Sequence, residues 1–418
     1  MKFSELDGKT IVLWGLGRET IALQEQLTKR LPDARVTAVI DDDTPETEAG
    51  ALLDDADVLV RSPGVSIYKP LIQEAIQNGT PVTTATGLWL AEREGRRVIG
   101  VTGTKGKSTT ATVIAHLLSQ ITPTELAGNI GRPVIELLDL DPEIWVVLEL
   151  SSYQLADLTT GPEIAVMTNL YREHTDWHGS EERYRADKLR IFEFPQTRAR
   201  VEPLTGTSSW HVDEAGNVLH NQELILAVAQ IPLRGRHNAV NVATALAAIE
   251  AAGLETPPLP GSLEALEPLP HRLQTVHIDP SGLEWVDDSI STTPESTIAA
   301  LEAYSDRPVV LLAGGQDRGQ DYDELARHIS SRAQPTALVL LPGTGERLAT
   351  AARAHGHPED RMSTAGDMRD ATARARELAL PGAVVLLSPA APSYNTHRNF
   401  EERGEDFAAN AKSVALSG

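Results

Sequence analysis

A glycine-rich segment with lysine and hydroxyl side chains is the strongest chemical signal in the sequence. It runs from Thr102 to Thr109 and has the sequence Thr-Gly-Thr-Lys-Gly-Lys-Ser-Thr. Glycines let the backbone wrap closely around phosphate, so that amide hydrogens and the following helix N-terminus face the anion. Lys107 can then reach the terminal phosphates, and the Ser108 hydroxyl can bind Mg²⁺. Because Val101 replaces the earlier glycine of the longer P-loop pattern, the segment predicts the shorter form of a nucleotide-binding loop.

A second glycine pair, Gly15 and Gly17, follows an apolar run near the N-terminus. Such a pair is typical of a dinucleotide fold, but the sixth position of that fingerprint is Thr20 rather than glycine. A nucleotide diphosphate at this strand edge is the interpretation we favour over a redox cofactor. Arg18 would supply positive charge, and the acidic cluster that begins at Asp41 would accept hydrogen bonds from ribose or base.

A third group of polar residues follows two later strands. Glu149 ends one predicted strand, and His174 lies shortly after the next. The carboxyl ends of parallel strands meet at one crevice, so these side chains and Ser108 are expected to converge beside the glycine loop as ligands for Mg²⁺. An ordinary surface histidine is the alternative at His174. Lys188, by itself, is typical of a solvated lysine.

Composition excludes several classes of protein. The chain has 418 residues, 37 Lys and Arg against 59 Asp and Glu, a net charge of −22, and no cysteine. Nonspecific binding to nucleic acid or anionic lipid needs a basic face, so neither partner is expected. Without cysteine there are no disulfides, cysteine-bound metals or thiol nucleophiles. No apolar run has the length of a signal peptide or a bilayer span, which predicts a cytoplasmic protein.

Short β-branched runs alternate with helical patterns, which predicts an α/β fold with parallel sheets. A basic, polar connector near residue 95 and a Pro-rich stretch at 257–270 indicate boundaries. We therefore expect domains at 1–95, 96–268 and 269–418. The expected strands are 11–14, 36–40, 58–60, 98–101, 145–150, 164–168, 309–312, 337–341 and 383–387, and helices are expected at 19–30 and 108–119.

Taken together, the motifs resemble those of the Mur ligases of peptidoglycan synthesis, and the resemblance extends over nearly the whole chain. Its motifs are Gly103–Thr109, Gly128–Gly131, Glu149–Gln154, His174–Lys188, His237–Asn241, Pro270–Arg272, Asp288–Ser289 and Leu387–Phe400. The family implies three domains: a Rossmann-like domain for the UDP end of the substrate, a central P-loop ATPase and a Rossmann-like C-terminal domain.

The resemblance also implies an activity. A Mur ligase of this kind joins glutamate to UDP-N-acetylmuramoyl-L-alanine through an acyl phosphate, with ATP and with Mg²⁺, of which the family's pattern implies two ions. The family's lysine at the position of Lys188 is carbamylated by CO₂, which converts a cation that would repel Mg²⁺ into an oxygen ligand. The expected partners are the UDP-substrate and glutamate, and a monomer is expected.

Site residues carry over by motif. The ATP contacts implied by the resemblance are Gly103, Thr104, Lys105, Gly106, Lys107, Ser108, Thr109, Asn241, Arg272 and Asp288. The implied metal ligands are Ser108, Glu149, His174 and carbamylated Lys188; with Lys107, the last three form the implied catalytic set. The UDP-substrate would contact Arg18, Asp41, Gly64, Asn129, Ser151 and Gln154. Glutamate would contact Thr292, Arg318, Ser393 and Phe400.

Two departures concern the stereochemistry of glutamate. Family members that add D-glutamate carry a lysine where this chain has Ile290, and an aspartate where it has Asn395. The runs Leu13–Glu19, Glu173–Gly179 and Asp288–Pro294 look more like a less common branch that adds L-glutamate. We therefore favour L-glutamate, with the D-glutamate-adding ligase as the alternative. A folylpolyglutamate-synthase-like ligase, a nicotinamide oxidoreductase and a regulatory or motor NTPase are further alternatives.

Overall fold

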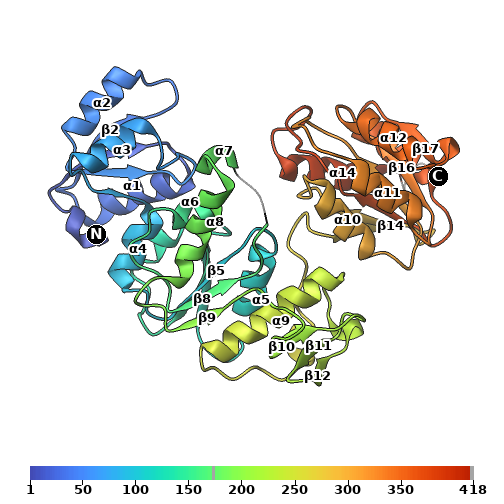
Figure 1. Ribbon diagram of the computed structural model, residues 1–418, viewed down its shortest axis with the longest axis horizontal. Coiled ribbons are helices and arrows are strands. Elements are labelled where there is room, and N and C mark those ends of the chain that lie inside the picture. Colours follow the sequence, from blue (N-terminus) through green and yellow to red (C-terminus); the bar gives the residue numbers. More distant parts are fainter. Residues whose placement is uncertain (172–174, 415–418) are drawn as a thin grey trace. The chain divides into compact units, whose positions relative to one another are not determined.

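Four β-sheets organise the part of the chain that the computed structural model describes, residues 1–171 and 175–414 (Figure 1). Three are parallel or largely parallel, and one is small and antiparallel. The chain divides into two compact units. Unit 1 contains Met1–Ile231 and Asn238–Leu266, and unit 2 contains Pro232–His237 and the chain from Glu267 onward.

The first sheet of unit 1 has the strand order β2-β1-β3-β4, and all its pairs are parallel. The loops after β1 and β3 therefore emerge at the same edge, which positions Arg18 and Gly64 for a shared site. Its elements are η1 (Phe3–Leu6), β1 (Thr10–Trp14), α1 (Arg18–Arg30), β2 (Arg35–Ile40), α2 (Glu46–Asp54), β3 (Val58–Arg61), α3 (Pro70–Gln77), β4 (Val82–Thr83) and α4 (Ala85–Arg93).

The second sheet of unit 1 is also parallel, in the order β6-β7-β5-β8-β9. The chain leaves β5 to one side and later returns to its other side, which places a topological switch point at the end of β5. The elements are β5 (Val98–Thr102), α5 (Lys107–Leu118), β6 (Thr124–Gly128), η2 (Val134–Leu137), β7 (Trp145–Glu149), α6 (Ser152–Leu155), β8 (Ile164–Met167), α7 (Thr175–His178), α8 (Glu181–Leu189), η3 (Arg190–Phe192) and β9 (Ala199–Val201).

One apolar core joins these two sheets. Leu23 of α1, Trp89 of α4 and Ile135 of η2 are buried in the same cluster. Removing this surface from water stabilises the contact, so the loops of both sheets are held in one unit. Unit 1 is completed by the antiparallel strands β10 (Trp210–Val212), β11 (Val218–His220) and β12 (Glu223–Leu226), with η4 (Val228–Gln230), α9 (Arg236–Ala251, whose first two residues belong to unit 2) and η5 (Gly261–Leu263).

Unit 2 contains a six-stranded sheet in the order β13-β14-β18-β15-β16-β17, in which only the β13 pair is antiparallel. Buried apolar clusters cover both faces of this sheet. The elements are β13 (Gln274–Ile278), β14 (Glu284–Asp287), α10 (Pro294–Glu302), β15 (Val309–Ala313), α11 (Asp323–Ser331), β16 (Thr336–Leu340), α12 (Gly345–Ala354), η6 (Glu359–Arg361), β17 (Met362–Thr364), α13 (Met368–Leu378), β18 (Val384–Leu387) and α14 (Phe400–Val414).

The predicted α/β fold class is confirmed, and the strands and helices expected from the sequence agree with the structure to within one residue at most ends. The small sheet β10–β12 and strands β4, β6, β9, β13, β14 and β17 were not predicted, because their short runs lack a period long enough to separate strand from loop. No helix in the described part of the chain is long and apolar enough to cross a membrane.

Candidate functional site

Two positions in the glycine loop between β5 and α5 require glycine. Gly103 has φ 146°, and a Cβ there would lie 2.0 Å from Thr168 Oγ1. Gly106, the N-cap of α5, has φ 79°, and a Cβ there would lie 2.3 Å from Asn241 Oδ1. Both are left-handed or crowded conformations that only glycine adopts without strain. The loop is thereby held against the end of β8 and against α9. It leads into the N-terminus of α5, and a helix N-terminus favours the binding of an anion such as phosphate.

Side chains from distant segments fix the backbone of this loop. Asn169 Oδ1 accepts hydrogen bonds from the amides of Thr104 and Lys105, at 3.2 and 2.8 Å. Thr104 Oγ1 lies 2.8 Å from the hydroxyl of Tyr184 on α8. The Lys107 amine donates to the Thr104 carbonyl at 3.0 Å, so its chain curls back over the loop. The loop is therefore shaped before any nucleotide arrives.

Lys188 and Glu149 lie beside this loop and are almost fully buried, with exposed fractions of 2% and 1%. The Lys188 amine donates to the Gly103 carbonyl at 2.6 Å. Glu149 pairs in register with Val101 on β5, and its Oε2 is buried without a hydrogen-bond partner. A buried carboxylate oxygen without a donor is costly unless a cation binds it. These residues therefore fit a Mg²⁺ ion beside the loop.

In the described residues, the other implied metal ligands do not form a site made only of carboxylate and imidazole side chains. Within residues 1–171 and 175–414, no three His, Asp or Glu side chains gather as a metal site. His174 lies outside the described residues. Ser108 is buried in the first turn of α5, next to Lys107. The donor set that the resemblance implies thus depends on Lys188 becoming an oxygen anion.

A chain of polar contacts leads from Glu149 to the first sheet. The Asn129 amide donates to Glu149 Oε1 at 2.8 Å, and the Arg18 guanidinium donates to the carbonyls of Asn129 and Gly131 at 3.3 and 3.2 Å. Arg18 begins α1, directly after the glycine pair of the N-terminal sheet. The contacts place the glycine loop and the start of α1 on the two sides of one candidate site.

A pocket of about 190 Å³ opens at this place, and loops of both sheets form its walls. Its lining consists of Arg18, Glu19, Ser62, Pro63, Gly64, Gly128, Asn129, Pro133, Ser151 and Tyr153. Four of the six residues expected to contact the UDP-substrate belong to it: Arg18, Gly64, Asn129 and Ser151. Asp41 and Gln154 do not line it. Asp41 is exposed and accepts a hydrogen bond from Thr44 Oγ1 at 2.8 Å within its own loop.

Gln154 does not line the pocket, but its hydrogen bonds fix one of the pocket's walls. Its Oε1 accepts hydrogen bonds from the amide and hydroxyl of Ser151 at 2.7 and 2.9 Å, which forms a capping box at the start of α6. Its Nε2 donates to Glu19 at 2.6 Å, and Thr86 Oγ1 donates to the other Glu19 oxygen at 2.9 Å. Burial raises the pKa of the Glu19 carboxyl. The orientation of Ser151 is thus set by a buried network.

A buried His–Asp pair behind this wall was missed by sequence reasoning. His178 Nδ1 lies 2.7 Å from Asp187 Oδ2, and His178 Nε2 lies 3.0 Å from Ser152 Oγ. The Tyr68 hydroxyl donates to Asp187 at 2.8 Å, and burial raises the pKa of that hydroxyl. These contacts tie α7 and α8 to the start of α6. The His-Gly-Ser sequence at 178–180 is too common to have indicated the pair.

In unit 2, buried acidic residues lie at the end of β14. Asp287 accepts a hydrogen bond from His271 Nδ1 at 2.7 Å, and this bond raises the pKa of His271. Asp288 accepts from Ser388 Oγ at 2.8 Å and from the Leu273 amide at 3.3 Å. Burial is the largest influence on Asp288 and raises its pKa to about 7. The strand end therefore holds a carboxyl that titrates near neutral pH.

Arg403 of α14 ties together two segments that were expected to bind glutamate. Its Nε and Nη2 donate to the hydroxyl and carbonyl of Ser289 at 3.0 and 2.8 Å, and its Nη1 donates to the Ala391 carbonyl at 3.0 Å. Ser289 Oγ in turn donates to the Phe400 carbonyl at 2.8 Å. Burial lowers the pKa of Arg403 to about 10, so the guanidinium stays charged.

The remaining predicted residues are placed as follows. Thr109 lies in the first turn of α5, and Asn241 Oδ1 accepts from Thr110 Oγ1 at 3.3 Å beside the loop. In unit 2, Arg272 precedes β13 and Thr292 lies just before α10. Ser393 is buried, and the exposed Arg318 places its guanidinium 5.6 Å from the ring centroid of Tyr394. The structure thus brings the residues of the glycine loop together in unit 1. It places the glutamate candidates in loops of unit 2 and, for Phe400, at the start of α14.

The raised pKa of Asp288 predicts a specific pH dependence of stability. The unfolded carboxyl titrates near 3.9, so between that pH and about 7 the folded state holds a proton that the unfolded state has released. The free energy of unfolding contributed by Asp288 therefore falls as the pH rises. Relative to Asp288→Asn, the wild-type protein should lose about 2 kcal/mol between pH 5.5 and 7.5 in urea unfolding experiments. Asp41→Asn, at an exposed carboxyl whose pKa Thr44 lowers, should cause no such difference, and identical pH slopes for wild type and Asp288→Asn would contradict the assignment.

Comparisons with known proteins agree with this architecture. Residues 101–202 match the Mur ligase middle domain, which includes the glycine loop, Glu149 and Lys188. Residues 271–391 match the glutamate ligase domain of Mur ligases, which includes Arg272, Asp288 and Arg318. Two family models thus cover the segments that carry most of the candidate residues.

Full-length relatives extend the similarity. The chain is 37% identical to a UDP-N-acetylmuramoyl-L-alanine–L-glutamate ligase of Micromonospora sp., over 99% of both chains. It is 38% identical to the protein of the same name from Xanthomonas euvesicatoria pv. vesicatoria, over 98% of this chain and 96% of that one.

Solved structures share the fold at lower sequence identity. The UDP-N-acetylmuramate-alanine ligase of Thermotoga maritima superposes with a TM-score of 0.62 at 18% identity, over 97% of this chain and all of the other. The MurF ligase of the same organism, solved in complex with ADP, gives a TM-score of 0.57 at 15% identity, over 99% of this chain and 97% of that one. With the full-length identity to the curated ligases, these findings show that the chain belongs to the Mur ligase family of ATP-dependent ligases of peptidoglycan synthesis.

Proposed function

We propose that this enzyme joins L-glutamate to UDP-N-acetylmuramoyl-L-alanine, with ATP converted to ADP and phosphate. The observation that carries the proposal is the link from the glycine loop to the pocket through Glu149 and Asn129. This link supports an alanyl carboxylate in the pocket beside the γ-phosphate at the loop. The name shared by the full-length relatives supports glutamate as the amino acid.

The chemistry follows from the bond to be made. A carboxylate does not react with an amine at neutral pH, because an oxide is a poor leaving group. In the proposed reaction, an oxygen of the alanyl carboxylate attacks the γ-phosphorus, and the bond from that phosphorus to ADP breaks. The amine of glutamate then attacks the carbonyl carbon of the acyl phosphate. The amide forms, phosphate leaves with the bonding electron pair, and the amine's proton passes to solvent.

The chain's own residues position these groups. The backbone amides of 103–109 would hold the ATP phosphates, and Lys107 would lower the repulsion between the alanyl carboxylate and the γ-phosphate. Ser108, Glu149, His174 and carbamylated Lys188 would hold Mg²⁺. When bound there, Mg²⁺ neutralises charge on the phosphates. Asn241, Arg272 and Asp288 would contact the nucleotide, and Thr292, Arg318, Ser393 and Phe400 the incoming glutamate.

The same proposal includes the remaining expectations from the sequence. It places domain boundaries near residues 95 and 268. It describes a cytoplasmic monomer whose partners are the two small-molecule substrates, without nucleic acid or a membrane. Analytical ultracentrifugation at micromolar concentration tests the oligomeric state.

A side-by-side rate measurement with the two glutamate enantiomers tests the function. ADP release should require UDP-N-acetylmuramoyl-L-alanine and glutamate together, and L-glutamate should give a kcat/KM at least about 100-fold above that of D-glutamate. Ile290 in place of a lysine and Asn395 in place of an aspartate support this preference. Faster turnover of D-glutamate would overturn the stereochemistry alone. ADP release without either acceptor, or only with a folate substrate, would overturn the ligase assignment.

A further inference from the structure

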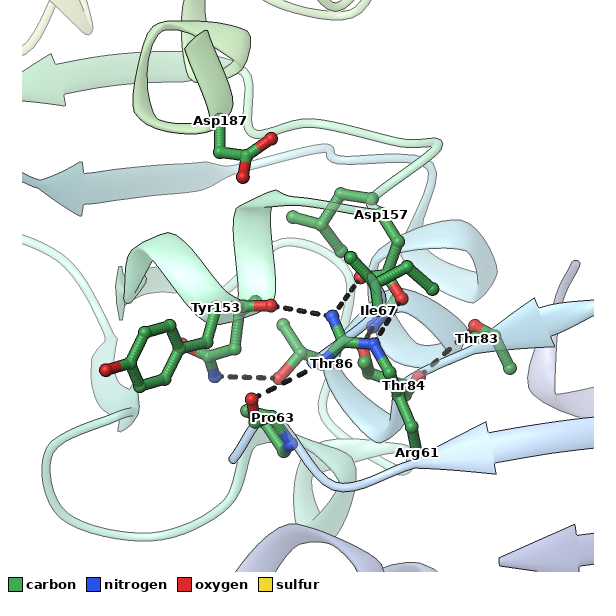
Figure 2. Close-up of polar contacts among 12 residues, drawn as sticks. Arg61, Pro63, Ile67, Thr83, Thr84, Thr86, Tyr153, Asp157 and Asp187 are labelled. Atoms are coloured by element: carbon green, nitrogen blue, oxygen red, sulfur yellow. Dashed lines mark hydrogen bonds and ion pairs between the residues drawn. The ribbon is translucent and has the colours of Figure 1, made fainter. Parts of the chain in front are cut away.

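Arg61, the last residue of β3, is a fully buried arginine whose five N–H groups all have acceptors. Its Nε and Nη2 donate to the two carboxylate oxygens of Asp157 at 2.7 and 2.6 Å, and Nη2 also donates to the Tyr153 carbonyl at 2.6 Å. Its Nη1 donates to the carbonyls of Val65 and Pro63 at 3.0 and 3.3 Å. Figure 2 shows the guanidinium between the Pro63 side and the Tyr153–Asp157 segment.

These bonds connect the two walls of the pocket. Ser62, Pro63 and Gly64 form one wall, in the loop after β3, and Ser151 and Tyr153 belong to the other, at the start of α6. Arg61 itself does not line the pocket. Arg61 donates hydrogen bonds to the backbone of the first wall at Pro63 and to the backbone of the second wall at Tyr153. The length of its side chain therefore determines the distance between the two walls.

Trp177 also contacts both walls of the pocket. Its indole N–H donates to the Gly64 carbonyl at 3.0 Å, and its ring stacks on Tyr153 at 4.5 Å between centroids. The Arg61 guanidinium lies 5.5 Å from the centroid of this ring. Arg61 is therefore the group that the loop, α6 and α7 share.

The hydrogen bonds that connect the two pocket walls require an arginine at position 61. A buried cation is stable only when it is paired and fully hydrogen-bonded, and Asp157 supplies the charge in bidentate geometry. The remaining donors are then available for backbone carbonyls that an apolar residue would leave unsatisfied. Lysine could keep the charge, but it has three donors and no planar fork, so it cannot hold both walls and both carboxylate oxygens.

We propose that Arg61 is a positioning residue for the UDP-substrate: it holds the Ser62–Gly64 loop at the distance from α6 that the muramoyl-alanine end requires. This proposal rests on the proposed function. The positioning role concerns binding of the UDP-substrate and not of the nucleotide, because the glycine loop would bind the nucleotide whatever the distance between the two pocket walls.

Two variants test the proposal. Arg61→Lys keeps an ion pair with Asp157 but loses carbonyl bonds. The double variant Arg61→Met with Asp157→Leu removes both charges and all the hydrogen bonds of the guanidinium without leaving an unpaired buried charge. The control is Arg30→Lys. Arg30 makes a similar two-pronged pair with Asp139, also between the first sheet's elements and the segment after η2, but neither residue lines the pocket.

The KM and Kd for UDP-N-acetylmuramoyl-L-alanine should rise about tenfold in Arg61→Lys and further in the double variant. The KM for ATP and the kcat at saturation should stay within about threefold of wild type. Arg30→Lys should change none of these quantities. Hydrogen exchange should be faster at 62–65 and 151–155 in the double variant, whose melting temperature verifies that it is folded.

The possible failures can be told apart. If wild type binds the UDP-substrate and a folded double variant binds it equally tightly, the positioning role of Arg61 is wrong and the proposed function stands. If the KM for ATP rises as much as that for the UDP-substrate, Arg61 has a general structural role and the proposal is again wrong. If wild type does not bind the UDP-substrate, both proposals are overturned.

Discussion

Lys188→Ala is expected to lower kcat by about a thousandfold, because the proposed carbamate would supply an oxygen ligand to Mg²⁺ that alanine lacks. Lys188 is 2% exposed and its amine lies 2.6 Å from the Gly103 carbonyl, at the back of the glycine loop. A cation in that place would repel Mg²⁺, whereas a carbamate would supply oxygen ligands in addition to Glu149, whose Oε2 is buried without a hydrogen-bond partner. Steady-state ADP release, with both acceptor substrates present, measures the loss.

Two comparisons separate a carbamate from a purely structural lysine. Short carboxylic acids should partly restore the rate of Lys188→Ala, since they supply the missing oxygen ligand. Lys188→Arg keeps a cation that can donate to the Gly103 carbonyl but cannot be carbamylated, so it should be as inactive as the alanine variant and should not be rescued. A near-normal rate for Lys188→Arg would contradict the proposal that Lys188 acts as a carbamate.

Lys107→Ala is expected to remove turnover by a similar factor, about a thousandfold, while the affinity for the UDP-substrate stays close to that of wild type. Lys107 begins α5, and its amine already curls over the loop to the Thr104 carbonyl at 3.0 Å. In the proposed reaction, a cation held there would lower the repulsion between the attacking carboxylate and the γ-phosphate, which matters mainly in the transition state. It does not line the pocket, so substrate binding there should persist.

Calorimetric titration with UDP-N-acetylmuramoyl-L-alanine, alongside kcat, checks this separation. Lys107→Met keeps the length of the side chain without its charge and should behave like the alanine variant. Lys29→Ala, at an exposed lysine in the last turn of α1, should leave both quantities unchanged. Equal loss of turnover and of UDP-substrate affinity in Lys107→Ala would count against the assigned role.

The glycine loop shows how far local sequence can predict a site. Its position between a β-branched strand and a helix indicated phosphate binding, and the structure has that strand–loop–helix unit at Val98–Leu118. The strand–loop–helix unit is confirmed, because its determinants are local: glycines that allow φ above zero and a helix N-terminus that follows within a few residues. Phosphate binding by this loop stays a prediction. The sequence also predicted Glu149 at the same sheet edge as the glycine loop, since parallel strands bring their carboxyl ends to one edge, and the structure pairs it with Val101.

Gln154 shows where the same reasoning stopped. The motif marked it as a contact for the UDP-substrate, but its side chain is buried and engaged with Ser151, Glu19 and Thr86. A motif identifies a residue that a site needs without saying whether it touches the ligand or holds a neighbour that does. The difference depends on which side of α6 faces the pocket, and the packing of α6 against α1 and α4 decides it.

The sequence by itself determined the α/β class and the strand–loop–helix unit that carries the glycine loop, because each depends on periodicity or on spacing within a few residues. Only the tertiary structure decided that Arg61 meets Asp157, 96 residues away, and that His178 joins Asp187 to Ser152. Buried polar groups must find partners wherever the fold brings them, and such pairings between distant segments leave no period in the sequence.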